Sequence, residues 1–197
     1  MANDQKNHRQ SITIRFPFSR TINDWVASRK NRKALEVSGW HFSAYREDMV
    51  LKESYDWREF YLPICVKDLI VLDVGAGEGE TARFFLDNGA KKVICIESCH
   101  EAFKYLKTNS VIHHQLVPIN KFFELSDLSD YSFDFLKMDI EGYEEILLPT
   151  KLFCPAIVEV HGLQLRDKFK NAGWRIKYRT FGAAKGYGCV SYAYWKC

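Results

Sequence analysis

The chain has 197 residues, of which 47% are hydrophobic and 27% charged, the composition of a globular protein with room for one buried core. No apolar run approaches the length of a membrane span and the first residues are polar, so we expect no transmembrane helix, no signal peptide and a cytoplasmic location. The six cysteines are scattered without a C-x-x-C pair, which favours buried thiols over a zinc site.

The N-terminal segment is basic. Residues 1–33 hold eight Lys and Arg against two Asp, a balance of 8 − 2 = +6, whereas the whole chain carries +3. Such a segment is either a solvated extension or a contact for an anionic partner such as RNA. Its pattern predicts a short strand over Ser11–Phe16 and a helix over Thr21–Leu35.

The next segment, residues 41–61, is rich in aromatic and charged side chains. We expect it to lie against the mouth of a ligand site and to close over it. The candidates for contact with a ligand or substrate are Glu53, Tyr55 and Arg58.

A glycine-rich loop follows the first apolar run, Leu69–Val74, which we expect to be a buried strand. Three glycines at alternate positions lead into a helix predicted over Thr81–Asn88. Glycines let a ligand approach the backbone, and the N–H groups at the start of the helix point into the same space. The next predicted strand, Lys92–Glu97, ends in a carboxylate that can accept hydrogen bonds from ribose hydroxyls. These features predict a nucleoside site.

The spacing of this loop argues against a dinucleotide, because the third glycine of that fingerprint would stand at Glu80 and is found at Gly79. We expect Glu78 and Glu80 at the loop mouth, where they would repel a diphosphate and suit a ligand with sulfonium and ammonium groups. The residues predicted to bind the cofactor are Asp73, Gly75, Ala76, Gly77, Glu78, Gly79, Glu97, Ser98, Asn120 and Asp139.

The loop resembles motif I of the class I S-adenosylmethionine-dependent methyltransferases, which implies S-adenosyl-L-methionine as the cofactor. Strands and helices alternate over the rest of the chain, as expected for a mostly parallel sheet. The further predicted elements are a helix over Glu101–Asn109, a strand within His114–Ile119, a strand over Phe133–Asp139, a helix from Glu141 to before Pro149, a strand over Ala156–His161, a helix over Leu163–Ala172, and strands over Arg175–Thr180 and Cys189–Trp195.

The predicted fold is therefore α/β and Rossmann-like: a mostly parallel seven-stranded sheet flanked by helices, with an antiparallel C-terminal hairpin. We expect it over residues 67–197, preceded by the basic extension and lid over residues 1–66. The turn at Asn120-Lys121 should lie near the adenine.

A second motif, Lys137-Met138-Asp139-Ile140-Glu141-Gly142-Tyr143-Glu144, places Asp139 at the carboxyl end of a strand, the edge where open α/β sheets bind ligands. It resembles the signature of FkbM-type methyltransferases, with Lys137, Asp139, Glu141, Gly142 and Glu144 at the characteristic positions. The resemblance spans Asp68 to about Gly162. It implies O-methylation of a hydroxyl on a sugar, glycan or other small-molecule acceptor.

An attacking alcohol must lose its proton. His161, just past a predicted strand, is the first candidate for the base and Asp139 the second, with Glu141 as a further catalytic candidate. His161 is alternatively a neutral packing residue, and Lys137 is expected to hold Asp139 by an ion pair. Glu144 either acts at the site or merely pairs with a lysine or caps its helix. The main prediction includes no metal, but Asp139, Glu159 and His161 form an alternative ligand set for a divalent cation.

Two other functions stay open from the sequence. One is an RNA methyltransferase acting on ribose or another oxygen, which would use the basic segment and stack a base on the aromatic residues between positions 40 and 61. The other is a non-catalytic nucleoside-binding domain with the same fold.

Overall fold

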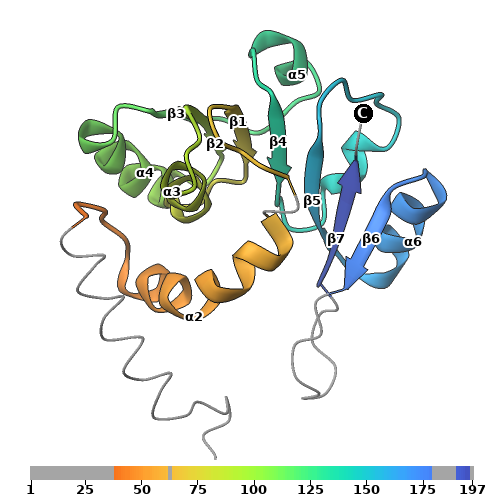
Figure 1. Cartoon of the computed structure of the whole chain (residues 1–197), viewed down its shortest axis with the longest axis horizontal. Helices are drawn as coiled ribbons and strands as arrows, with labels where there is room; N and C mark the ends of the chain where they lie inside the picture. Colours follow the sequence, from red (N-terminus) through yellow and green to blue (C-terminus); the bar gives the residue numbers. More distant parts are fainter. Residues whose placement is uncertain (1–37, 62–63, 179–189, 196–197) are drawn as a thin grey trace, which may run out of the picture.

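The computed structural model describes residues 38–61, 64–178 and 190–195, and its centre is one seven-stranded sheet with the strand order β3-β2-β1-β4-β5-β7-β6 (Figure 1). The strands are β1 (Ile70–Val74), β2 (Lys92–Glu97), β3 (Leu116–Asn120), β4 (Phe135–Met138), β5 (Ala156–His161), β6 (Arg175–Tyr178) and β7 (Val190–Trp195). The first five pair in parallel, and β7 is antiparallel to both β5 and β6. The predicted sheet with its C-terminal hairpin is confirmed.

Helices cover both faces of the sheet. They are α2 (Ala44–Tyr61), α3 (Glu80–Asp87), α4 (His100–Ile112), α5 (Asp127–Asp130) and α6 (Leu163–Asn171), with a 3₁₀ turn η1 (Glu144–Leu147). None of the helices in the described part of the chain is long and apolar enough to span a membrane.

The strands distribute their side chains alternately between two cores, as the period of two in a strand requires. In β1, Val71 belongs to the core under α2, α3 and α4, whereas Leu72 and Val74 belong to the core under α6 and η1. Asp73 therefore points to the same face as Val71, toward α2 and α3. The face on which a charged side chain of a strand lies thus determines which partners it can reach.

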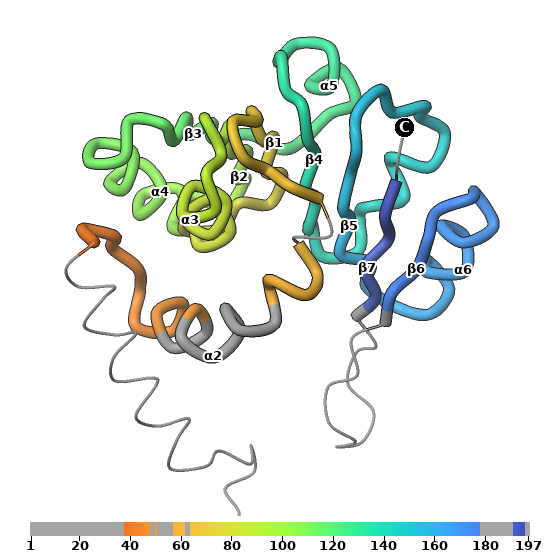
Figure 2. Tube along the Cα trace, in the orientation of Figure 1, coloured from red at the N-terminus to blue at the C-terminus, as the bar shows by residue number. Residues whose placement is uncertain are grey.

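The segment over residues 41–61 was predicted to be a lid, and α2 occupies most of it. Trp57, Phe60 and Tyr61 are buried in the core with Phe84 and Phe85 of α3, so this end of α2 is part of that core. The trace in Figure 2 shows α2 below α3 in this view. The side chains of Glu53 and Tyr55 lie outside the described part, as do the strand and helix predicted within residues 1–37 and the hairpin loop. Arg58 is exposed and does not line the cavity described below.

The helix predicted from Glu141 is wrong. Glu141 and Gly142 both adopt left-handed backbone angles, with φ of 54° and 100°, which an α-helix does not tolerate. Only the short turn η1 fits between this loop and Pro149. The other elements predicted within the described residues are present with ends shifted by a few residues, and the bounds of β2 and β5 agree with the prediction.

Candidate active site

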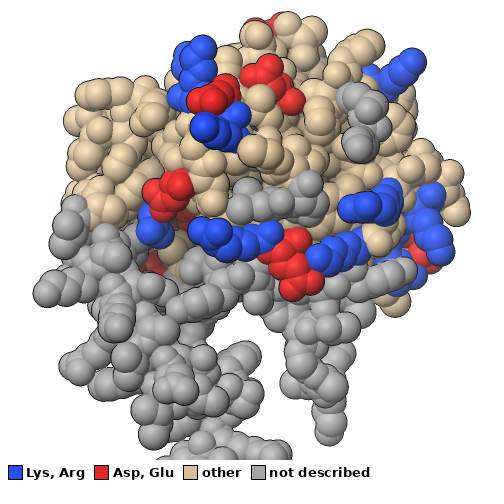
Figure 3. Space-filling view, in the orientation of Figure 1, with Lys and Arg blue, Asp and Glu red and all other residues tan. Residues whose placement is uncertain are grey.

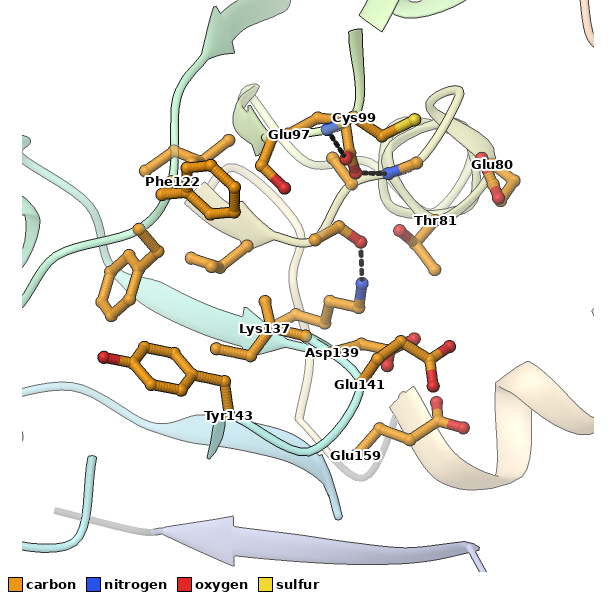
Figure 4. A pocket seen from close by; sticks show the side chains of 18 of the residues that line it. Glu80, Thr81, Glu97, Cys99, Phe122, Lys137, Asp139, Glu141, Tyr143 and Glu159 are labelled. Carbon is orange, nitrogen blue, oxygen red and sulfur yellow. Dashed lines mark hydrogen bonds between the residues drawn. The ribbon is translucent and has the colours of Figure 1, made fainter. Parts of the chain in front are cut away.

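A cavity of about 970 Å³ opens at the carboxyl ends of the central strands, with the glycine loop along one side and α2 along another (Figure 4). Of the residues predicted to bind a cofactor, six line this cavity: Gly75, Ala76, Gly77, Glu97, Ser98 and Asp139. All three predicted catalytic residues, Asp139, Glu141 and His161, also line it. The glycine loop and the motif that begins at Lys137 therefore contribute to the same cavity.

Gly75 joins the two motifs at their closest approach. Its φ is 72°, and a Cβ there would lie 1.7 Å from the backbone oxygen of Asp139. No side chain fits at that distance, so the position requires glycine for two separate reasons. The loop after β1 and the end of β4 are thereby held against each other.

Glu97, at the end of β2, holds the glycine loop with its side chain. Oε2 accepts a hydrogen bond from the backbone N–H of Gly77 (2.8 Å), and Oε1 accepts one from Cys99 (2.6 Å). A carboxylate has about four acceptor positions, so two are left for ribose hydroxyls. The figure shows this carboxylate directed at the loop and bordering the cavity (Figure 4).

Four of the predicted cofactor contacts do not line the cavity, and each has a supporting contact instead. Glu78 turns to the start of α2, where its two oxygens accept bonds from the N–H and hydroxyl of Ser43 at 2.6 Å each. Gly79 precedes α3 and packs against Leu106 and Trp40. Asn120 donates to the backbone oxygen of Glu97 at 2.7 Å.

Asp73, the fourth, is fully buried beneath the loop. It pairs with Lys137 (Oδ1 to Nζ, 2.9 Å) and accepts a hydrogen bond from Thr81 (2.6 Å). Lys137 also donates to the backbone oxygen of Gly75 at 3.0 Å. Burial opposes the charge of Lys137, but Asp73 and Asp139 outweigh it and raise its pKa. Lys137 was expected to pair with Asp139; its direct partner is Asp73.

Only one of the two acids expected at the loop mouth lines the cavity. Glu80 does so, and it forms an ion pair with Arg46 of α2 (3.0 Å) and accepts the backbone N–H of Glu78 (2.7 Å). Burial raises the pKa of Glu80. Arg46 belongs to the charged segment expected at the mouth of the site, but the sequence did not single out this contact, which joins residues 34 positions apart.

The other end of the cavity holds what we term the acid–histidine cluster: Asp139, Glu141, Glu144 and His161. Nδ1 of His161 lies 2.8 Å from Oε1 of Glu144, which also accepts the N–H of Gly142 at 3.0 Å. Nε2 of His161 lies 3.7 Å from Asp139 and 3.6 Å from Glu141. Glu144 does not pair with a lysine among the described residues.

These carboxylates favour the charged form of the imidazole. Burial alone would lower the pKa of His161, but the bond to Glu144 and the charges of Asp139 and Glu141 raise it to about 9. The ring is therefore protonated at neutral pH in the ligand-free protein and cannot accept another proton there. The assignment of His161 as a base stays a prediction.

Glu159 was considered in the sequence only as a metal ligand. It lines the cavity, and its Oε2 accepts a hydrogen bond from the buried hydroxyl of Tyr61 in α2 (2.9 Å). Burial, and then the charge of Asp139, raise the pKa of Glu159 to about 7. The signal for this residue was an acid inside the largely apolar strand β5. Tyr61 belongs to the aromatic segment expected against the site, but the sequence did not single it out.

No protein-family model matches the chain, and a search of curated proteins finds no match. The resemblance to FkbM-type enzymes is thus not confirmed. Solved structures do match. A ribosomal protein L11 methylase from Lactobacillus delbrueckii subsp. bulgaricus is 21% identical, with a TM-score of 0.53 over 74% of this chain and 79% of that one.

Two other methyltransferase structures are similar. A precorrin-6y C5,15-methyltransferase from Geobacter metallireducens is 14% identical, with a TM-score of 0.54 over 74% of this chain and 87% of that one. Fibrillarin from Aeropyrum pernix, crystallised with natively bound S-adenosyl-L-methionine, is 15% identical, with a TM-score of 0.52 over 66% and 68%. The chain therefore has the Rossmann-like fold found in these methyltransferases.

Proposed function

We propose that this protein is a methyltransferase that uses S-adenosyl-L-methionine. The observation that carries the proposal is the position of Glu97, whose carboxylate reaches the glycine loop at the edge of a large cavity in a fold shared with methyltransferases. The cofactor's ribose would bind Glu97, its methionine part would lie along Gly75–Gly77, and its adenine would reach the exposed ring of Phe122 after β3.

The charges around the cavity support this cofactor over a dinucleotide. Six carboxylates line it, those of Glu80, Glu97, Glu124, Asp139, Glu141 and Glu159. Of the lining cations, Arg46 is paired with Glu80, Lys137 with Asp73 and Lys121 with Asp127, and the imidazolium of His161 lies among the carboxylates of its cluster. The net negative surrounding suits a sulfonium and an ammonium group and opposes a pyrophosphate.

For the reaction, we propose O-methylation of a hydroxyl on a sugar, glycan or other small molecule. The sulfonium already activates the methyl group, so the protein must align the acceptor oxygen in line with it and assist removal of the proton. The acid–histidine cluster borders the cavity at the end away from Glu97, where such an oxygen would enter.

An RNA acceptor receives less support from the described residues. Trp40, Trp57, Phe60 and Tyr61, which could have stacked a base, are buried in the core, and Trp40 stacks instead on His113 at 4.2 Å between ring centroids. On the face drawn in Figure 3, Lys and Arg lie among Asp and Glu, and the described residues form no unbroken basic surface there.

Isothermal titration of the full chain tests the cofactor. S-adenosyl-L-methionine and its demethylated product should both bind one to one, and NAD should not. Tight binding of NAD, or no binding of either sulfur compound, would overturn the proposal. Transfer of a labelled methyl group to a panel of sugars and small alcohols, with total RNA as a separate arm, then tests the acceptor. A protein that binds the cofactor and methylates nothing would be the non-catalytic domain.

A further inference from the structure

The acid–histidine cluster has a composition that differs from the rest of the cavity: three carboxylates surround one imidazole within a few ångströms. Ligand atoms of Asp139, Glu144 and His161 all lie within 4.8 Å of one another. The residues come from the end of β4, the turn η1 and the end of β5, so three separate elements converge at this point.

Two carboxylate oxygens of the cluster lack a hydrogen-bond partner among the described residues. Glu144 is fully buried, and while its Oε1 is bonded, its Oε2 has no partner. Oδ1 of Asp139 is also shielded from solvent without a partner. A buried carboxylate oxygen without a donor is costly, because it loses its hydration and gains nothing in exchange. Both therefore indicate a ligand that carries positive charge or hydrogen-bond donors.

The spacing around Nε2 of His161 fits a metal ion better than hydrogen bonds. Nε2 is 3.7 Å from Asp139 and 3.6 Å from Glu141, both beyond hydrogen-bonding distance. Two donors that each lie about 2.1 Å from one cation are separated by roughly 3.0–3.4 Å. A closure of a few tenths of an ångström would bring Nε2 of His161 and an oxygen of Asp139 to the separation of two donors on one ion.

Glu144 has a second role in this arrangement. Its Oε1 holds Nδ1 of His161 at 2.8 Å, which directs Nε2 toward Asp139 and Glu141. A carboxylate that binds the second nitrogen of a histidine in this way orients the ring and increases its basicity as a metal ligand. Glu159, which the sequence suggested as a ligand, is engaged by Tyr61 instead, and neither Glu159 nor Glu141 belongs to the group within 4.8 Å.

We propose that Asp139, Glu144 and His161 bind a divalent cation, with the bonded oxygen of Glu144 also positioning His161. Two carboxylates and one imidazole suit Mn²⁺ and similar first-row divalent ions, because oxygen donors favour the harder ions and imidazole accommodates the transition metals. The binding site stands on its own geometry. Its use, to hold the acceptor oxygen next to the methyl group, rests on the proposed function.

Mn²⁺ titration of the full chain in the absence of S-adenosylmethionine tests the site, with free Mn²⁺ followed by its electron paramagnetic resonance signal. We expect saturable binding of one ion per chain. Asp139→Asn and His161→Gln should each weaken binding by at least about tenfold, and Glu144→Gln by about 10–100-fold. The matched control is Glu101→Gln, an exposed acid paired with Lys104 outside the cavity, which should bind as the wild type does.

Absence of saturable binding to the folded wild type, or equal binding by wild type and His161→Gln, would overturn the proposal, as would an equal loss in Glu101→Gln. Circular dichroism and titration of His161→Gln with S-adenosylmethionine in a chelator show whether that variant is folded. Because the metal is measured without cofactor and the cofactor without metal, failure of the cation site and failure of the methyltransferase proposal are distinct outcomes.

Discussion

At the β1–β2 end of the cavity both oxygens of Glu97 accept backbone N–H groups, whereas at the β4–β5 end Asp139 and Glu144 each keep an oxygen with no partner among the described residues. The backbone contacts of Glu97 persist without a ligand, so the first end is formed in advance. The second end gathers like charges around His161 and is completed only when positive charge binds there. The Glu97 end of the cavity is thus held in shape by backbone hydrogen bonds, whereas the β4–β5 end needs a bound ligand to satisfy its carboxylates.

The largest effect is expected where the two ends touch. Gly75→Ala would place a Cβ 1.7 Å from the backbone of Asp139, and we expect a loss of about 3 kcal/mol or more in the free energy of unfolding. Gly173→Ala is the matched control, since Gly173 also has a positive φ of 90° but a Cβ there meets nothing within 4 Å. It should lose only about 1–2 kcal/mol. Equal losses in urea unfolding would contradict the close approach.

The next effect concerns the buried ion pair beneath the loop. Lys137→Met leaves Asp73 charged, fully buried and without its cation, which should cost about 3–5 kcal/mol. Lys104→Met, which breaks the exposed pair with Glu101, should change little. Urea unfolding of both variants measures the difference, and a Lys137→Met protein as stable as the Lys104 variant would show that Asp73 is not charged.

Glu97→Ala tests the Glu97 end of the cavity, which is formed without a ligand. Loss of the ribose contacts should weaken S-adenosylmethionine binding by about 1–3 kcal/mol, the effect of leaving hydrogen-bonding groups unpaired. Glu145→Ala removes an acid that pairs with Lys168 outside this cavity, and it should leave the affinity unchanged. Isothermal titration of both variants with S-adenosylmethionine measures the two affinities. An unaltered affinity in Glu97→Ala would remove that residue from the site.

The smallest effect is a pH dependence at the ligand-dependent end, measured with a chelator present. The pKa of His161 rises from about 6.5 in the unfolded chain to about 9 in the fold. Its stabilising contribution is therefore complete below about pH 6.5 and disappears as the pH passes 9. At pH 6 the free energy of unfolding of the wild type should exceed that of His161→Gln by roughly 1–2 kcal/mol. This is less than the full pKa shift would give, because the ring is partly exposed. The difference should disappear by pH 10. A difference in stability that does not change with pH would contradict a protonated His161.

Prediction from the sequence succeeded where local pattern suffices. The strands β2 and β5 are apolar runs with clear ends, and their bounds agree with the prediction. The helix after β4 failed because Glu141, although a good helix former, takes a left-handed conformation that no local preference indicates.

For the polar residues near the cavity, too, the local pattern predicted the position in the chain but not the direction of the side chain. Asp73, Glu78 and Asn120 belong to motifs at the cavity, yet all three are directed at the protein itself, at Lys137, Ser43 and the backbone of Glu97. Sequence position placed them near the site but not on its surface. The direction of a side chain depends on which neighbouring strand or helix offers it a partner.

The sequence by itself determined the order of the strands along the chain, the glycine loop and the acid at the end of β2, because hydrophobic period and glycine spacing act over a few residues. Only the tertiary structure decided that Glu144 meets His161 across 17 positions, that Tyr61 holds Glu159 and that Asp73 belongs to Lys137. Those pairings follow from burial, since a charge removed from water must find a partner in whatever element packs against it.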